Sequence, residues 1–112
     1  MISLSLSFLG LFGQVVTVTG NKLEVRDIKG KYVASSYYSS MNDAIAGCGI
    51  VVIWYKNNKA EVRTEKLEYI TSSYYSNIKK VTTTGKNIVL YYKNNKVEVR
   101  DVNLKYISSR YQ

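Results

Sequence analysis

The sequence has no proline, no histidine and a single cysteine, Cys48. Without proline, the chain is neither a proline-rich linker nor a collagen-like segment. Without histidine, it has no imidazole to act as an acid, a base or a zinc ligand near neutral pH. One cysteine cannot close a disulfide within the chain, so we expect none of the stapling typical of small secreted domains. We interpret Cys48 as a small buried hydrophobic residue.

Long apolar runs are also missing. No run approaches the roughly 20 residues that a membrane-spanning helix needs. Residues 1–8 alternate apolar side chains with serine and carry no basic segment, which favours a strand over a signal peptide. We therefore expect a cytoplasmic protein with no membrane partner.

What the sequence does contain is a globular composition with a basic balance. Its 112 residues are 46% hydrophobic, carry a formal charge of +8 and include eleven tyrosines. That length fits one domain, and the apolar content is too high for a disordered tail.

An internal repeat dominates the sequence. The pattern Asn-Lys-x-Glu-Val-Arg occupies residues 21–26, 58–63 and 95–100, a spacing of 37 residues both times. Sliding the chain by that spacing aligns it from end to end without gaps, as expected for a repeat protein. The identical columns are Val15/Val52/Val89, Asn21/Asn58/Asn95, Lys22/Lys59/Lys96, Glu24/Glu61/Glu98, Val25/Val62/Val99, Arg26/Arg63/Arg100, Tyr32/Tyr69/Tyr106, Ser35/Ser72/Ser109 and Tyr37/Tyr74/Tyr111. We predict one domain, 1–112, made of repeats 1–37, 38–74 and 75–112.

Each repeat has the pattern of four short strands. In the third repeat these are residues 80–84, 87–93, 96–102 and 105–110, with alternating or β-branched side chains. Asn94-Asn95 lies between the middle two strands, where a two-residue turn needs a positive φ that asparagine tolerates. The chain is therefore predicted to be all-β.

Two endings resemble those of β-propeller blades. Val25-Arg26-Asp27 and Val99-Arg100-Asp101 resemble the Val-Trp-Asp ending of a blade's third strand, and residues 27–32 resemble the Asp-x-x-Gly-Lys turn into its outer strand. The resemblance implies one four-stranded blade per repeat, without indicating a particular family. A monomeric β-trefoil, which also has three four-stranded units, is the alternative.

Three blades would leave an apolar sheet face uncovered at each end, because a blade needs neighbours on both sides. Closed symmetry is the usual solution. We therefore predict a homodimer that forms a six-bladed propeller.

No residues form a recognisable catalytic set. The eight carboxylates are dispersed, and the segment Thr84-Gly85-Lys86-Asn87 lacks the upstream glycine and following Ser or Thr of a phosphate loop. We predict that the protein is not an enzyme and that it uses no cofactor and no metal.

The repeated polar columns are the candidate ligand-binding residues. They are the pairs Glu24/Arg26, Glu61/Arg63 and Glu98/Arg100, together with Tyr37, Tyr74 and Tyr111. Each Glu/Arg pair shares one face of a strand, and either holds neighbouring blades in register or presents guanidinium groups to an anion or a sugar. The three tyrosines suit an interface between blades or a sugar ring. The column that begins at Tyr32 is interpreted as packing between sheets.

Charge is concentrated in the third repeat, which is +6 by residue count, against +2 and 0 for the first and second. The favoured function is a non-enzymatic binding module with equivalent sites on one face, and with a protein or glycan ligand. One alternative is a lectin-like carbohydrate-binding protein. Another is a binder of anions, nucleotides or nucleic acid through the third repeat.

Overall fold

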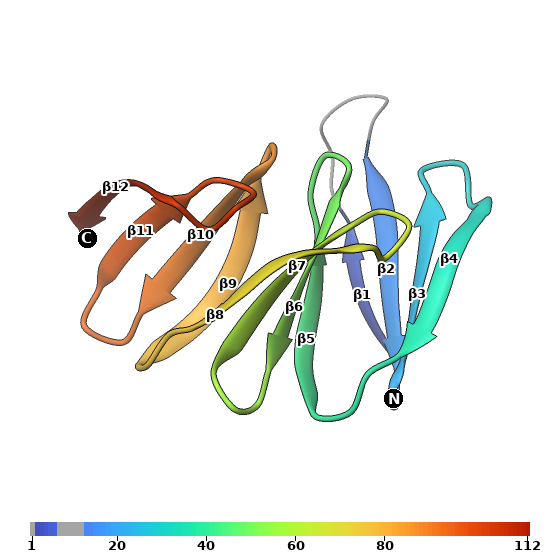
Figure 1. The fold of residues 1–112 in the computed structure, drawn as a ribbon, viewed down its shortest axis with the longest axis horizontal. Coiled ribbons are helices and arrows are strands. Elements are labelled where there is room, and N and C mark those ends of the chain that lie inside the picture. The colour runs from blue at the N-terminus through green and yellow to red at the C-terminus, as the bar shows by residue number, and fades with distance from the viewer. Residues whose placement is uncertain (1, 7–12) are drawn as a thin grey trace.

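The computed structural model describes residues 2–6 and 13–112, which form β-strands joined by short turns (Figure 1). The strands are β1 (Ile2–Leu6), β2 (Gln14–Thr19), β3 (Lys22–Asp27), β4 (Tyr32–Tyr37), β5 (Met41–Ala46), β6 (Ile50–Tyr55), β7 (Lys59–Thr64), β8 (Tyr69–Tyr74), β9 (Ile78–Thr84), β10 (Asn87–Tyr92), β11 (Lys96–Arg100) and β12 (Tyr106–Tyr111). Among the described residues there is no helix long and apolar enough to cross a membrane.

The strands form three separate antiparallel sheets, which we number first, second and third in chain order. Their strand orders are β1-β2-β3-β4, β5-β6-β7-β8 and β9-β10-β11-β12, so strands adjacent in sequence pair with each other. The sheets stand face to face across the molecule (Figure 1). The structure has the arrangement of propeller blades and not the single shared barrel of the β-trefoil alternative.

The second sheet is buried on both faces because it has a neighbour on each side. Its strand β6 reads Ile-Val-Val-Ile-Trp-Tyr, and five of these six side chains are buried. Side chains alternate between faces along a strand. Accordingly Val52 and Trp54 pack toward the third sheet, whereas Val51 and Ile53 pack toward the first.

Two hydrophobic cores fill the spaces between the sheets. The core between the second and third sheets contains Ile45, Ile50, Val52, Trp54, Ala60, Val62, Ile78, Val81, Ile88, Leu90 and Leu104. The core between the first and second contains Val16, Leu23, Val25, Ala44, Ala46, Val51, Ile53 and Leu67. The burial that stabilises this fold therefore lies between repeats rather than inside any one of them.

A hydrogen bond and a close backbone approach also join the sheets. The buried side-chain Nε2 of Gln14 donates to the carbonyl of Ile50 at 2.7 Å, which links the first sheet to the second. A Cβ on Gly47 would lie 2.8 Å from the carbonyl oxygen of Gly85. Only glycine at position 47 lets the second and third sheets approach this closely.

The gapless sequence alignment of the repeats does not hold for the strand pairing, because the register of the first sheet differs by one residue. Val52 pairs with Val62 and Val89 pairs with Val99, but in the first sheet Val16, not Val15, pairs with Val25. The cause is the middle hairpin, which has the two-residue turn Gly20-Asn21 in the first sheet and a three-residue loop in the others. The Val15/Val52/Val89 column is therefore not structurally equivalent.

The longer hairpins also correct the predicted turn. Asn58 and Asn95 have φ of 71° and 70°, and their amides donate to the carbonyls of Tyr55 and Tyr92. This is a three-residue loop in which a tight turn is followed by a residue in the left-handed region. The two-residue turn predicted at Asn94-Asn95 is wrong, although asparagine does supply the positive φ.

Candidate functional site

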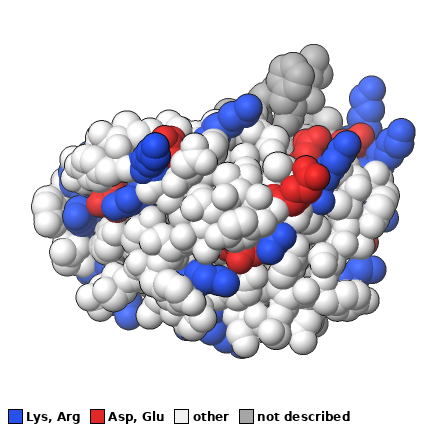
Figure 2. All heavy atoms as spheres, in the orientation of Figure 1, with Lys and Arg blue, Asp and Glu red and all other residues white. Residues whose placement is uncertain are grey.

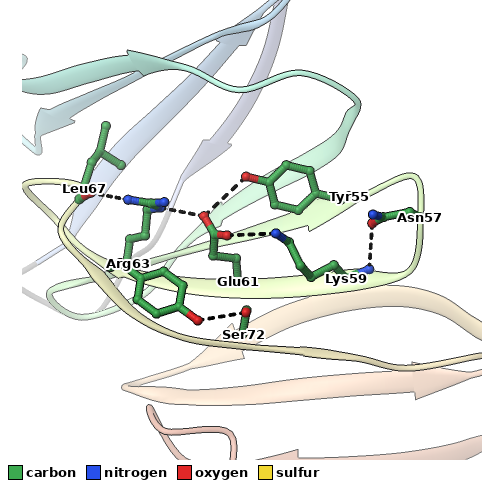
Figure 3. A network of polar contacts seen from close by, with 8 residues as sticks. Tyr55, Asn57, Lys59, Glu61, Arg63, Leu67 and Ser72 are labelled. Carbon is green, nitrogen blue, oxygen red and sulfur yellow. Dashed lines mark hydrogen bonds and ion pairs between the residues drawn. The ribbon is translucent and has the colours of Figure 1, made fainter.

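A network of polar contacts lies on strand β7 and its neighbours (Figure 3). We call it the Glu61 network, after the carboxylate at its centre. One oxygen of Glu61 accepts from Arg63 Nε at 2.6 Å and from the Tyr55 hydroxyl at 3.3 Å, and the other lies 3.3 Å from Lys59 Nζ. Glu61 itself is only 4% exposed, so its charge is neutralised within the protein.

The local backbone places these groups. Lys59, Glu61 and Arg63 alternate along β7 and so share a face. A β-bulge between Val62 and Arg63 shifts the pairing with β8, and bulges commonly redirect a side chain. Arg63 Nη1 donates to the carbonyl of Leu67 at 2.8 Å, which closes the turn between β7 and β8.

The same network recurs in the third sheet, around Glu98. Glu98 accepts from Arg100 Nε at 2.8 Å and from the Tyr92 hydroxyl at 3.0 Å, and lies 3.5 Å from Lys96 Nζ. Arg100 Nη1 donates to the carbonyl of Leu104 at 2.8 Å. We call this the Glu98 network.

Burial and charge shift the pKa values of both networks. Burial raises the pKa of Tyr55 to about 12, aided by the negative charge of Glu61. Burial likewise raises the pKa of Tyr92 to about 12, aided by its hydrogen bond to Glu98. Burial alone would raise the pKa of Glu98, but the hydrogen bonds from Arg100 and Tyr92 outweigh it and the pKa is lowered. Both tyrosines are therefore neutral donors at physiological pH, and Glu98 is an ionised acceptor.

Each network reaches the preceding sheet through a tyrosine. The guanidinium of Arg63 lies over the ring of Tyr38, 5.0 Å from its centroid, and Arg100 lies over Tyr75 at 5.1 Å. Both tyrosines lie in the connections between sheets, and the Tyr38 amide donates to the carbonyl of Asn21 in the first sheet. The Glu61 and Glu98 networks therefore lie at the junctions between blades.

The first sheet has only part of this arrangement. Arg26 pairs with Glu24 and donates to the carbonyl of Gly30, as its counterparts do. The Arg26 side chain is 44% exposed, against 20% for Arg63, because no described residue from a preceding sheet covers it. Gly30 occupies the position at which the other sheets have leucine.

The predicted tyrosines are on the surface. Tyr37, Tyr74 and Tyr111 are 72%, 65% and 69% exposed at the ends of the outer strands, so they do not pack between blades. The Tyr32 column is wrong as an inter-sheet contact, because Tyr32 and its equivalents are exposed and hydrogen-bond to serines on the same strand.

Other predicted features have simple structural accounts. Cys48 is half-buried rather than buried, and its amide donates to the carbonyl of Gly85. Gly85 has a φ of 61° in a hairpin turn, as the turn interpretation of that segment requires. Within residues 2–6 and 13–112, no three or more acidic or cysteine side chains gather where they could hold a metal ion.

The pairs Tyr37-Tyr38 and Tyr74-Tyr75 indicate the passage from one blade to the next, but Tyr38 and Tyr75 were not among the predicted binding residues. They are 37 residues apart, but the next position in the series is Gln112, so the column is not identical in all three repeats. Leu67 and Leu104 were missed for the same reason, since the first repeat has Gly30 there. The available signal was identity between two repeats rather than three.

Comparison with known proteins identifies the fold. No family model matches the chain, and no curated protein sequence matches it. Solved structures of β-propeller proteins do match, so the three sheets are propeller-like blades. The prediction of blade repeats is confirmed.

Three of these solved structures have similar statistics. HIRA(644–1017) matches with a TM-score of 0.76 and 13% identity, over 99% of this chain and 40% of that one. Hsv2 from Kluyvelomyces marxianus matches with a TM-score of 0.75 and 10% identity, over 97% and 38%. BBS1N in complex with ARL6DN matches with a TM-score of 0.69 and 15% identity, over 100% and 40%. The chain thus spans about 40% of the length of these structures.

Proposed function

We propose that this chain of propeller-like blades is a non-enzymatic binding module that completes its ring by pairing with a second copy of itself. One observation supports the proposal. The outer faces of the first and third sheets have residues equivalent, by repeat, to those on the faces that pack together inside the chain. A second copy related by a twofold axis would bring the third sheet of each chain against the first sheet of the other. Six blades would then form one ring.

The outer face of the third sheet is built like a face that packs. Val89, Val97 and Val99 occupy the positions that Val52, Ala60 and Val62 occupy in the core between the second and third sheets. Ile107 is 49% exposed on this face, whereas its counterpart Ile70 packs against that same core. Covering Ile107 would remove the same kind of apolar surface from water.

The outer face of the first sheet offers the complementary positions. Val15 pairs with Arg26 as Val51 pairs with Arg63. Val15 is therefore the counterpart of Val51, which packs against the preceding sheet. Likewise, the exposed Glu24/Arg26 pair is the counterpart of Glu61 and Arg63, whose network lies at a junction between blades. Thr17, which pairs with Glu24 as Ile53 pairs with Glu61, makes this position more polar than its internal counterpart.

Closure is expected to be weaker than the contacts inside the chain. The side chain of Leu67, which packs at the internal junction, is replaced by Gly30. The backbone amide of Gln112 donates to the carbonyl of Asn95, just as the amide of Tyr75 donates to the carbonyl of Asn58. Gln112 therefore stands at the position of the tyrosine that stacks on an arginine. Both losses remove apolar contact from the closing junction, so the dimer should dissociate on dilution.

Analytical ultracentrifugation over a dilution series tests ring closure. We expect a dimer at high concentration, and Ile107→Asp should shift it to monomer because the new charge would be buried without a partner. Asn103→Asp is the matched control, since it adds the same charge to the exposed turn before β12. A monomer at every concentration, or a dimer that tolerates Ile107→Asp while circular dichroism shows a folded protein, would overturn closure.

The binding role rests on where the polar residues are. Glu61 and Glu98 are engaged internally, which leaves the exposed tyrosines of the outer strands as the contact surface. Exposed tyrosine is enriched at interfaces because it has an apolar ring and a polar tip. One solved propeller similar to this chain, BBS1N, was crystallised in complex with ARL6DN, which supports a role in interaction.

Affinity capture with a quantitative comparison tests this role. Proteins retained by the wild type should be lost with the combined change Tyr37→Ser, Tyr74→Ser and Tyr111→Ser, and kept with Ser36→Ala, a change on the same outer strand as Tyr37. Identical capture by wild type and triple variant would contradict the proposed surface. Turnover of any substrate by the purified chain would contradict its non-enzymatic character.

A further inference from the structure

A groove opens beside the Glu98 network, at the edge of the third sheet. It has a volume of about 500 Å³ and lies between the connection from β8 to β9 and the hairpin between β10 and β11. Both segments are at the lower edge of the molecule in Figure 1. The residues that line the groove are Ser76, Asn77, Tyr92, Lys93, Asn94, Lys96 and Tyr111.

The groove is positively charged. Of the described residues, two lysines line it and no acidic side chain does. Lys96 is fixed in place, because its Nζ lies 3.5 Å from Glu98 and 5.3 Å from the centre of the Tyr92 ring. Lys93 is exposed, and lysine and arginine side chains lie along this lower edge in Figure 2. One anionic group would therefore be attracted to the groove.

The rest of the lining suits a hydroxyl-bearing ring. Tyr111 is 69% exposed and so presents an open aromatic ring. The Asn94 side-chain oxygen accepts from the Lys96 amide at 3.1 Å, which leaves the side-chain NH₂ of Asn94 to donate elsewhere. An aromatic face with a few fixed polar groups matches the chemistry of a sugar and its hydroxyls.

Most of the groove residues recur in the second sheet on the same backbone frame, although Ser40 replaces Asn77. Tyr55, Lys56, Asn57, Lys59 and Tyr74 stand 37 residues before their counterparts. The Lys56 amide donates to the carbonyl of Ser40 at 2.9 Å, and the Lys93 amide donates to the carbonyl of Asn77 at 2.8 Å. The side-chain oxygen of Asn57 accepts from the Lys59 amide at 3.2 Å, as that of Asn94 accepts from the Lys96 amide.

The first sheet lacks this arrangement. Its shorter hairpin has the turn Gly20-Asn21, and neither Thr19 nor Gly20 supplies the lysine and asparagine of the other loops. Only Lys22 and Tyr37 correspond to groove residues there. The difference gives two equivalent positions in this chain rather than three.

We propose that the groove of the third sheet, and the corresponding residues of the second, bind an acidic sugar, one that carries a carboxylate or sulfate group on a hydroxylated ring. This inference deepens the proposed binding role by assigning a ligand class to a defined place. The lysines would hold the anionic group, Tyr111 or Tyr74 would stack on the ring, and the asparagine amide would donate to a hydroxyl. An acidic sugar fits better than a nucleic acid, because the groove has two lysines beside one exposed tyrosine, which suits one anionic ring, whereas a nucleic acid strand needs a continuous basic track.

Isothermal titration calorimetry with defined oligosaccharides tests the proposal. The probes are a sulfated oligosaccharide, a uronic-acid oligosaccharide and a neutral oligosaccharide of the same length, with inorganic sulfate and single-stranded RNA for comparison. We expect the first two to bind at two sites per chain, with affinity that falls as salt rises, and the neutral sugar to bind at least roughly tenfold more weakly. The ratio between the sulfated and uronic probes identifies the preferred anionic group.

Variants locate the binding. Tyr111→Ser should reduce the number of sites from two to one, and the combination with Tyr74→Ser should abolish binding. Ser108→Ala is the control on the same strand as Tyr111, because Ser108 is exposed and does not line the groove, and it should leave binding unchanged. Lys93→Gln should weaken binding at one site and reduce its dependence on salt.

Three results would overturn the proposal. They are equal binding of neutral and acidic sugars, tighter binding of RNA or of sulfate alone than of either acidic oligosaccharide, and binding that survives the double tyrosine change. None of these depends on ring closure, which sedimentation measures, or on protein capture. Failure of the sugar proposal is therefore distinguishable from failure of the proposed function.

Discussion

The guanidinium of Arg63 lies 5.0 Å from the centre of the Tyr38 ring, which the chain places at the junction between the first and second sheets. The same arginine binds Glu61 on its own strand and the carbonyl of Leu67 in the next turn. One side chain thus joins three segments of the fold. The repeated Glu-Val-Arg pattern is explained by this role at a junction between blades.

Glu61→Ala should be much more destabilising than Glu24→Ala. Removing Glu61 leaves Arg63, Lys59 and the Tyr55 hydroxyl without their acceptor in a largely buried site, and breaking such a pair costs about 3–5 kcal/mol. The Glu24–Arg26 pair is much more exposed and should contribute about 0–1 kcal/mol. Urea unfolding of the two variants measures the difference. Equal losses would show that burial of the network does not determine its contribution.

Stability should decline in alkali between about pH 10 and 12. The pKa of Tyr55 and of Tyr92 is raised from 10.0 to about 12 in the folded chain, so above pH 10 the unfolded chain loses these protons first. The stabilisation is complete below pH 10 and is lost as the pH rises through the folded value. Ultraviolet titration of tyrosinate should show a component near pH 12 that Tyr55→Phe combined with Tyr92→Phe removes. An unchanged titration curve in the double variant would refute the assignment.

Leu67→Gly should be more stable than Leu67→Ala, by roughly 1 kcal/mol, which reverses the usual order. Leu67 has a φ of 67°, a conformation that strains any residue with a Cβ and that glycine adopts freely. Leu23, which is buried in the same core on strand β3, is the control. There Leu23→Gly should be less stable than Leu23→Ala, and thermal unfolding of all four variants provides the test. The usual order at position 67 would show that backbone strain does not matter there.

Much of the fold could be predicted from the sequence because the repeat is nearly complete. In the third repeat, the predicted strand 87–93 corresponds to Asn87–Tyr92, and the predicted strand 105–110 to Tyr106–Tyr111. The identical columns also indicated the Glu/Arg pairs, since a motif of six residues keeps both partners on one face. Periodicity is sufficient for predictions of this kind.

The rest depended on differences between repeats that a search for identity discards. The turn Gly20-Asn21 is one residue shorter than its counterparts, which changes the register of β2 without disturbing the sequence alignment. Leu67 has the positive φ that Gly30 and Leu104 also have at this turn, and its side chain packs into a core formed with another sheet. Neither the shorter turn nor this tertiary packing is visible in the propensity of a single segment.

The second sheet contributes side chains to both hydrophobic cores, whereas the first and third each contribute to one. In a linear array of three sheets, the middle sheet takes part in both interfaces, so its unfolding removes both of them. Unfolding should therefore proceed inward from the flanks, and amide protons of β6 should exchange with solvent last, only when the entire array opens. The second sheet therefore holds the other two together, and it should unfold only after the first and third sheets have unfolded.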